Sequence, residues 1–278
     1  MSKVAIVTDS TAYIPAPVVE DHRITVIPLT VNFDDGSVED GLGDLRAFFD
    51  RVERSAGFPV TSQPPLGKFI EIYERLISEG KEVISVHISS KLSGTCETAR
   101  TAAGMVAPEK ISVIDSQQIL GCMGFLVLQA AERAAAGQDR QAVVKMVEKW
   151  KKEIRFYFVP ATLEYLRRGG RIGGAEALLG TLLQIRPVLC IKDGQVEVLA
   201  KVRTWKRAIE RILQEMPQDH TSLWVGMGHG LAHTEMLRIA NAVKERAPGI
   251  AIDIWEMGPV IGLHIGPGAI GVAYWLRS

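Results

Sequence analysis

The chain has 278 residues, a length that predicts about two domains at roughly 150 residues each. Hydrophobic residues make up 47% of the sequence and charged residues 23%, a composition typical of a soluble globular protein. Its 32 Lys and Arg balance 32 Asp and Glu, and only 6% of its residues are aromatic. Because nucleic-acid binding rests on phosphate neutralisation and base stacking, these values argue against a dedicated nucleic-acid binder.

Cysteine content and hydropathy indicate the cellular compartment. Cys96, Cys122 and Cys190 are too few and too scattered for a disulfide framework or a closed zinc site, which favours a reducing cytoplasm. The N-terminal apolar run Val4–Val7 is too short for the core of a signal peptide. Residues 257–276 carry no charge, but their repeated glycines and prolines would leave backbone groups unpaired in lipid. We therefore expect a cytoplasmic protein without a membrane span.

The first half of the chain alternates short β-branched runs with helical patterns. The predicted strands are Val4–Val7, Thr25–Pro28, Glu82–His87 and Lys110–Asp115. The predicted helices are Asp44–Ser55, Gly67–Ser78, Gly94–Met105 and Ile119–Ala136. This alternation predicts a mostly parallel sheet with helices on both faces.

The second half contains a hairpin among helices and strands. The predicted helices are Arg140–Glu153, Thr204–Met216 and Ala232–Arg246, and the predicted strands are Ile154–Val159, Pro187–Ile191, Val196–Lys201, Leu223–Met227 and Ile250–Trp255. Asp193-Gly194 marks a hairpin turn, which suggests a mixed sheet. We therefore expect an α/β fold with two tightly packed α/β domains, over residues 1–155 and 156–278.

Three hydroxyl-rich segments stand out: two follow predicted strands, and the middle one comes just before a predicted helix. They are Thr8–Thr11, Thr61–Pro64 and Ser89–Thr95. Taken singly, each is more often a helix cap or a turn than a binding site. Because such strand ends converge on one crevice of an open α/β sheet, their recurrence favours a polar site. Ser93 is the strongest candidate, since a helix N-terminus at Gly94 suits an anion.

His264 stands apart from the other histidines because it lies in an uncharged, glycine-rich run. A buried imidazole needs partners, and a satisfied core histidine remains the alternative to a ligand-binding one. The glycine patterns at Gly226–Gly230 and Gly266–Gly271 lack the helix or the ribose-binding acid of a dinucleotide site. The sequence has no phosphate-binding loop, and His229 and His233, although spaced four residues apart, lack the glutamate of the metalloprotease pattern, so we expect no cofactor and no metal.

Arg167, Arg168 and Arg171 concentrate positive charge around two glycines. This cluster is either a solvated turn or a surface that docks an acidic partner.

Together these segments resemble the DegV family, the bacterial fatty-acid-binding proteins that include the binding subunit of fatty acid kinase. Seven segments carry the resemblance in family order: Thr8–Ser10, Thr61–Pro64, Leu92–Thr95, Asp115-Ser116, Leu166–Ile172, Arg186-Pro187 and Gly262–Gly268. Two positions depart from the family pattern. Arg186 replaces the usual Lys, and Ile265 replaces the usual Thr after the histidine, which alters hydrogen bonding near the head-group.

The resemblance implies one long-chain fatty acid held in a tunnel between the two domains. Its carboxylate would be bound by Thr61, Ser93 and His264; the neighbouring candidates are Gly94, Thr95, Ser62, Asp9 and Ser10. For an acid of about 16 to 18 carbons, burying about 15 methylenes at ~0.8 kcal/mol each gives on the order of 12 kcal/mol.

The resemblance also implies a lipid carrier without catalytic residues of its own. It would take a fatty acid from the membrane surface and present the carboxylate to a separate, ATP-binding fatty acid kinase subunit, which feeds phospholipid synthesis. Arg167, Arg168 and Arg171 would dock that kinase.

Two other functions remain open from the residues. One is an acyl-ester hydrolase with Ser93 as nucleophile, His264 as base and Asp9 as the orienting acid, although no nucleophile-elbow motif surrounds any serine. The other is a lipid sensor without a kinase partner.

Overall fold

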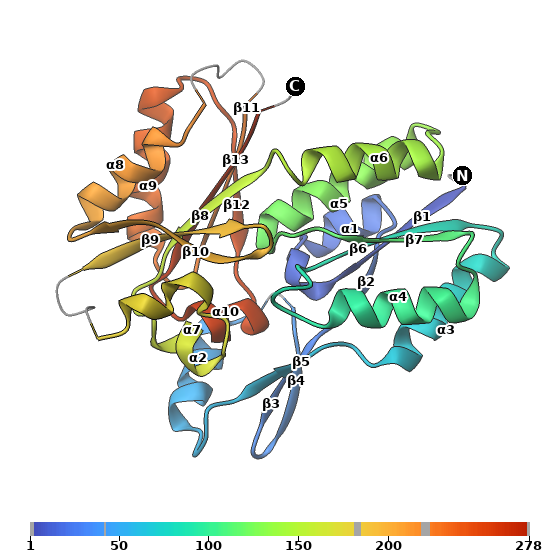
Figure 1. Cartoon of the computed structure of the whole chain (residues 1–278), viewed down its shortest axis with the longest axis horizontal. Helices are drawn as coiled ribbons and strands as arrows, with labels where there is room; N and C mark the ends of the chain where they lie inside the picture. The colour runs from blue at the N-terminus through green and yellow to red at the C-terminus, as the bar shows by residue number, and fades with distance from the viewer. Residues whose placement is uncertain (1–2, 42, 181–184, 218–222, 277–278) are drawn as a thin grey trace. The chain divides into compact units, whose positions relative to one another are not determined.

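The computed structural model describes residues 3–41, 43–180, 185–217 and 223–276, and the chain divides into two compact units (Figure 1). Unit 1 comprises Met1–Gly41 and Val60–Lys152. Unit 2 comprises Leu42–Pro59 and Glu153–Ser278. The sequence interpretation assigned residues 42–59 to the first domain, whereas they group with the C-terminal unit.

Unit 1 is built on a four-stranded parallel sheet in the order β2-β1-β6-β7. The strands are β1 (Val4–Asp9), β2 (Thr25–Ile27), β6 (Glu82–His87) and β7 (Ile111–Asp115). Their apolar, β-branched residues suit strands that are covered on both faces. Since all four strands run in the same direction, Asp9, His87 and Asp115 lie at the same edge of the sheet.

Helices cover both faces of this sheet (Figure 1). One face carries α3 (Leu66–Ser78) and α4 (Thr95–Val106), and the other carries α5 (Leu120–Ala135) and α6 (Arg140–Trp150). Phe69, Tyr73 and Ala99 are fully buried beside Val7 and Val83, and together they form the core under α3 and α4. The short α1 (Ala16–Asp21) follows the 3-10 turn η1 (Ser10–Ala12).

Helix α5 packs closely on η1 because Gly124 has no side chain. A Cβ at this position would lie 2.8 Å from the backbone oxygen of Ala12. The end of β1 is therefore held between the sheet and a helix.

A second, three-stranded antiparallel sheet in unit 1 was not predicted. Its order is β4-β3-β5, with β3 (Thr30–Phe33), β4 (Gly36–Glu39) and β5 (Val60–Ser62). Thr61 therefore lies on a strand and not in a helix-capping loop.

Unit 2 is built on a six-stranded mixed sheet in the order β10-β9-β8-β13-β11-β12. The strands are β8 (Arg155–Val159), β9 (Arg186–Lys192), β10 (Gln195–Val202), β11 (Leu223–His229), β12 (Ile252–Glu256) and β13 (Ile270–Leu276). β11 and β12 are parallel, and the other neighbouring strands are antiparallel. The predicted turn between β9 and β10 is confirmed, since Asp193 and Gly194 both have positive φ.

Two helices of unit 2, α8 (Trp205–Gln214) and α9 (His233–Arg246), cover one face of this sheet (Figure 1). Their buried residues join Val225 and Met227 in one apolar core. Four further elements belong to the unit: α2 (Leu45–Arg54), α7 (Glu164–Arg168), the 3-10 turn η2 (Gly173–Leu178) and α10 (Pro259–Ile265). Gly262 lets α10 approach α2, because a Cβ there would lie 3.2 Å from Leu45 Cδ1.

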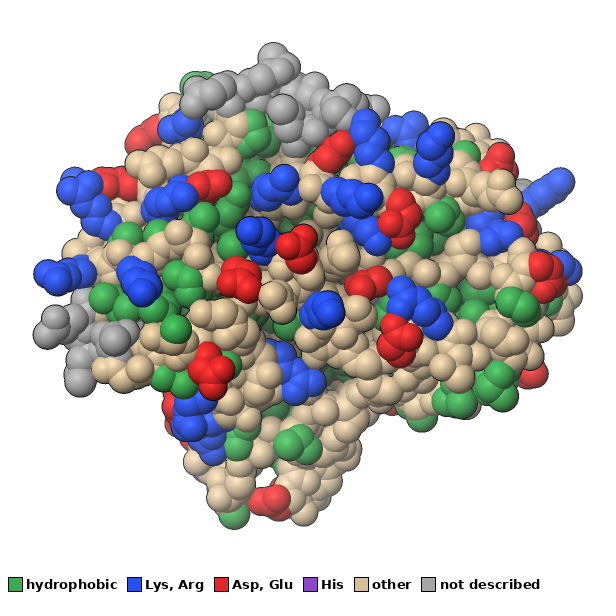
Figure 2. Space-filling view, viewed as in Figure 1, with side chains coloured by type: hydrophobic (Ala, Val, Ile, Leu, Met, Phe, Trp, Pro, Cys, Tyr) green, Lys and Arg blue, Asp and Glu red, His purple; other side chains and the backbone are tan. Residues whose placement is uncertain are grey.

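The predicted α/β fold, with a parallel sheet in one half and a mixed sheet in the other, is confirmed. Within the described residues, no helix is long and apolar enough to cross a membrane. The uncharged run 257–276 instead contains α10 and β13. Lysines and arginines alternate with aspartates and glutamates on the face shown in Figure 2, which agrees with the balanced charge of the sequence.

Candidate functional site

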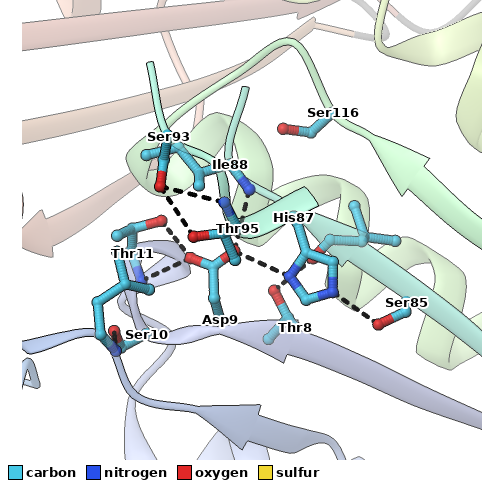
Figure 3. Close-up of polar contacts among 12 residues, drawn as sticks. Thr8, Asp9, Ser10, Thr11, Ser85, His87, Ile88, Ser93, Thr95 and Ser116 are labelled. Atoms are coloured by element: carbon cyan, nitrogen blue, oxygen red, sulfur yellow. Dashed lines mark hydrogen bonds and ion pairs between the residues drawn. The ribbon is translucent and has the colours of Figure 1, made fainter. Parts of the chain in front are cut away.

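The carboxylate of Asp9 organises the loops at the C-terminal edge of the unit 1 sheet (Figure 3). One oxygen accepts hydrogen bonds from the Thr11 backbone N–H at 3.1 Å and from the Thr11 hydroxyl at 2.5 Å. The other accepts from the Ile88 backbone N–H at 3.0 Å and lies 3.0 Å from Nδ1 of His87. Because Asp9 is fully buried, these four partners compensate for the loss of water around its charge.

His87 extends this network into the core. Its Nε2 lies 2.7 Å from the Ser85 hydroxyl, which also accepts from the Tyr73 hydroxyl at 2.8 Å. Burial raises the pKa of Tyr73, so its hydroxyl remains protonated as a donor. Asp9, His87 and Ser85 have the residue types of a hydrolytic triad, but they are bonded to one another in the core and join the ends of β1 and β6.

The Ser10 hydroxyl has a similar structural role. It donates to the Asp40 carboxylate at 2.7 Å and accepts from the Leu29 backbone N–H at 3.0 Å. The side chains of Asp9 and Ser10, both predicted as neighbours of a ligand, are thus engaged in bonds within the protein.

Ser93, Gly94 and Thr95 lie at the N-terminus of α4. The hydroxyls of Ser93 and Thr95 are 2.9 Å apart, and the Thr95 backbone N–H lies 3.3 Å from the Ser93 oxygen (Figure 3). Gly94 is the N-cap and provides no capping side chain. Two hydroxyls beside the positive end of a helix suit a carboxylate ligand.

The loop before α4 is held by two anchors. The Ser93 backbone N–H donates to the Ser89 oxygen at 3.1 Å. The Asp115 carboxylate accepts from the Ser90 backbone N–H at 3.2 Å and from the Ser90 hydroxyl at 2.5 Å. With Asp9 bound to the Ile88 N–H, both ends of the segment before Ser93 are fixed.

Gln63 brings the segment around Thr61 beside this loop. A Cβ at Gly94 would lie 2.0 Å from the Gln63 side-chain oxygen, so the glutamine amide occupies the space that any other residue would need. The same amide lies 2.5 Å from the Thr98 hydroxyl, one turn into α4. The structure therefore unites two of the predicted segments within unit 1.

Thr61 and Ser62 point to opposite faces of β5, because side chains alternate along a strand. The Ser62 hydroxyl accepts from the Asn32 amide at 2.7 Å and is exposed. Thr61, which pairs with Val31, is partly buried and is the better candidate for a ligand contact.

In unit 2, His264 lies in the last turn of α10. This helix begins with Gly258 as its N-cap and Pro259 at the first position, where proline needs no hydrogen-bond partner. Gly266 ends it with φ of 83°, a conformation that favours glycine. Burial, and secondarily the charge of Arg171, lowers the pKa of His264 to about 4, so the imidazole is neutral at neutral pH.

Each arginine of the predicted docking cluster has a partner within unit 2. Arg167 forms a two-bond salt bridge with Glu164 at 2.5 and 2.9 Å, which lowers the pKa of that carboxyl. The Arg168 guanidinium stacks 4.2 Å from the centre of the Phe58 ring, and Arg171 donates to the Gly169 oxygen at 2.8 Å. The cluster is an ordered element, with Arg167 and Arg168 exposed.

Sequence reasoning missed His87, Gln63 and Gly169. His87 is the last residue of the predicted strand β6, and Gln63 belongs to one of the hydroxyl-rich segments, but their partners are 78 and 35 residues away in sequence.

Within the described part of the chain, no group of three or more His, Cys, Asp or Glu residues is suited to hold a metal.

The lowered pKa of His264 predicts a specific loss of stability in acid. The unfolded imidazole, with a pKa of about 6.5, binds a proton before the folded one does. The contribution of His264 to the free energy of unfolding should therefore be constant above about pH 6.5 and fall as the pH drops toward 4. The full difference corresponds to roughly 3 kcal/mol, which the partial exposure of the ring reduces to on the order of 2 kcal/mol.

Urea unfolding of the wild type and of His264→Gln, after refolding to remove bound small molecules, measures this contribution. The difference between the two free energies of unfolding should change between pH 6.5 and 4 and stay level above that range. A difference that does not vary with pH would show that His264 titrates normally.

The comparisons with known proteins agree over the whole chain. The family model described as "Uncharacterised protein, DegV family" matches residues 3–277. A DegV domain-containing protein of Streptomyces coelicolor is 41% identical over 276 residues, which cover 97% of this chain and 97% of that protein.

Solved structures are also similar over their full length. One, from Thermus thermophilus, is described as fatty acid binding of a DegV family protein; its TM-score is 0.92, with 34% identity and 100% coverage of both chains. Another, a fat acid (stearic acid)-binding protein of Eubacterium ventriosum, has a TM-score of 0.87 and 25% identity, covering 99% of this chain and 98% of that one. This chain belongs to the DegV family.

Proposed function

We propose that this protein binds one long-chain fatty acid and presents its carboxylate to a separate kinase. The fatty-acid-binding proteins of the same family and fold support the ligand class. The observation that carries the proposal is the pair of hydroxyls, Ser93 and Thr95, 2.9 Å apart at the N-terminus of α4.

The head-group contacts we propose are neutral hydrogen-bond donors. In unit 1 these are the hydroxyls of Thr61, Ser93 and Thr95 with the backbone of Gly94, and in unit 2 the imidazole of His264. Hydroxyls and a neutral imidazole can each donate one hydrogen bond to a carboxylate. The lowered pKa of His264 supports this assignment, since it keeps the ring uncharged at neutral pH.

The acyl chain supplies most of the affinity in this proposal. About 15 buried methylenes at ~0.8 kcal/mol each exceed what a few neutral hydrogen bonds contribute, at about 1 kcal/mol each. The head-group therefore orients the ligand, and the chain retains it. Its source would be the membrane surface, where long-chain fatty acids partition.

We propose that a second protein performs the kinase step; the sequence contains no phosphate-binding loop of the Gly-Lys-Ser/Thr type. We propose that the partner is the ATP-binding subunit of a fatty acid kinase and that its acyl phosphate product enters phospholipid synthesis. Arg167, Arg168 and Arg171 are the proposed docking residues.

The hydrolase alternative requires Asp9 to orient His264, but the Asp9 carboxylate is bonded to other residues. Both oxygens of Asp9 already accept hydrogen bonds from Thr11, Ile88 and His87, and the Ser93 hydroxyl pairs with Thr95. A carrier needs none of the catalytic geometry that a hydrolase requires.

Removing a head-group donor should weaken binding of stearate. Ser93→Ala and His264→Ala should each raise the dissociation constant about 5- to 150-fold, which corresponds to 1–3 kcal/mol for a polar group left unpaired. Isothermal titration with stearate, after delipidation, gives the affinities.

Ser62→Ala is the matched control, because the Ser62 hydroxyl is bound to Asn32 and lies on the opposite face of β5 from Thr61. Its affinity should stay within about twofold of the wild type, as for other surface substitutions. If Ser93→Ala binds stearate as tightly as Ser62→Ala does, the assignment of the head-group to α4 is wrong.

Reversing one docking charge should impair the kinase step and spare ligand binding. Arg167→Glu should slow ATP-dependent phosphorylation of bound stearate by about tenfold, because rim charges mainly set the encounter rate and the orientation of two proteins. Added salt should produce a similar slowing in the wild type, since the screening length is about 8 Å at physiological ionic strength.

Arg207→Glu is the matched control. Arg207 and Arg167 are both exposed, at 72% and 51%, and each forms a salt bridge with a glutamate three residues away, Glu210 and Glu164 respectively. This variant should phosphorylate stearate at the wild-type rate. Equal rates for the two variants would place the docking surface elsewhere.

A further inference from the structure

Gly169 touches the ring of His264 where no side chain would fit. A Cβ at Gly169 would lie 2.1 Å from Nδ1 of His264 and 2.8 Å from its Cε1. The backbone of Gly169, with φ of −77° and ψ of −6°, is one that any residue adopts. The glycine is therefore required by the close approach of the imidazole and not by the turn itself.

The turn that carries Gly169 is fixed from both sides. Its backbone N–H donates to the Tyr165 oxygen at 2.9 Å, and its own oxygen accepts from Arg171 Nη1 at 2.8 Å. Arg171 is in turn held by its backbone N–H, which donates to the Leu166 oxygen at 2.9 Å. The surface behind the imidazole is thus a rigid piece of backbone.

A second glycine, at the end of α10, contacts a side chain of α7. Gly266, two residues after His264, lies against the Tyr165 ring, and a Cβ there would be 2.6 Å from Cδ2 of that ring. Helices α7 and α10 therefore meet through one glycine from each side. Because the Gly169 backbone lies directly against the His264 ring, the ring has little freedom to rotate toward α7.

We propose that Gly169 is a positioning residue for His264: its bare backbone, clamped by Tyr165 and Arg171, sets the ring so that Nε2 is the nitrogen presented to the ligand carboxylate. This inference rests on the proposed fatty-acid binding. It gives the arginine-rich turn a second role, since the segment proposed to dock the kinase also forms the support of the head-group histidine.

The protonation state of the ring agrees with this arrangement. Burial and Arg171 lower the pKa of His264 to about 4, so a single N–H is present at neutral pH. A carboxylate accepts only from a protonated nitrogen, and the Nδ1 edge is directed at Gly169. The tautomer that binds the ligand is therefore the one with its proton on Nε2.

The test is a double-mutant cycle with stearate as the probe. Gly169→Ala should weaken stearate binding about tenfold to a hundredfold, as expected when one hydrogen bond to a charged group is lost. In a His264→Ala background the same substitution should change affinity by less than about twofold, because Gly169 acts through the imidazole. An equal loss in both backgrounds would mean a general structural effect and would overturn the proposal.

Gly43→Ala is the matched control, since Gly43 is in the same unit and a Cβ there meets nothing within 4 Å. It should bind stearate as the wild type does. If Gly169→Ala binds like Gly43→Ala while His264→Ala remains impaired, the positioning role is wrong and the head-group assignment stands. If His264→Ala itself binds normally, the proposed head-group assignment is wrong.

A second variant tests the clamp without adding bulk. Arg171→Gln removes the guanidinium that holds the Gly169 oxygen, so it should shift the ring ¹⁵N resonances of His264 and raise the pKa of that histidine. NMR of ¹⁵N-histidine-labelled protein measures both effects. Unchanged His264 resonances in this variant would contradict the proposal even if Gly169→Ala fails to fold.

Discussion

The buried carboxylate of Asp9 is the interaction on which the candidate site of unit 1 depends. It joins the end of β1 to the turn at Thr11 and to the start of the loop that leads from β6 to Ser93. An unpaired buried charge would cost several kcal/mol, so removing either Thr11 or His87 would leave Asp9 poorly compensated. Ser93 and the first residue of α4, Thr95, are consequently positioned by a loop that begins at a residue bonded to the core of the sheet.

The proposed neutral donors would leave the ligand carboxylate more reactive toward phosphorylation by a kinase than a charged donor would. An arginine bound to both carboxylate oxygens would hold the ligand more tightly, but it would also stabilise the charge that must attack phosphorus. Hydroxyls and a neutral imidazole orient the carboxylate with less loss of its nucleophilicity. Arg171 is consistent with this arrangement. Its guanidinium donates to the Gly169 oxygen, and its charge lowers the pKa of His264.

The parts of the fold that sequence analysis predicted are those that depend on local pattern. The β-branched run Glu82–His87 and the Asp193-Gly194 turn are found where they were expected. The uncharged run 257–276 has no clear periodicity, so α10 and β13 were missed, and residues 42–59 joined unit 2 through contacts that are distant in sequence. Ser93 and His264 could be identified as candidates because each lies in a recognisable local motif. The contacts of Gln63 with Gly94 and of Gly169 with His264 could not be predicted, because the partners are distant in sequence.

The central claim, that this chain carries a long-chain fatty acid, is tested most directly by native mass spectrometry of freshly purified protein. The account predicts a population heavier than the polypeptide by the mass of one long-chain fatty acid, which organic extraction removes and added stearate restores. A protein that has only the polypeptide mass, and that gains no mass when stearate is added, would contradict it.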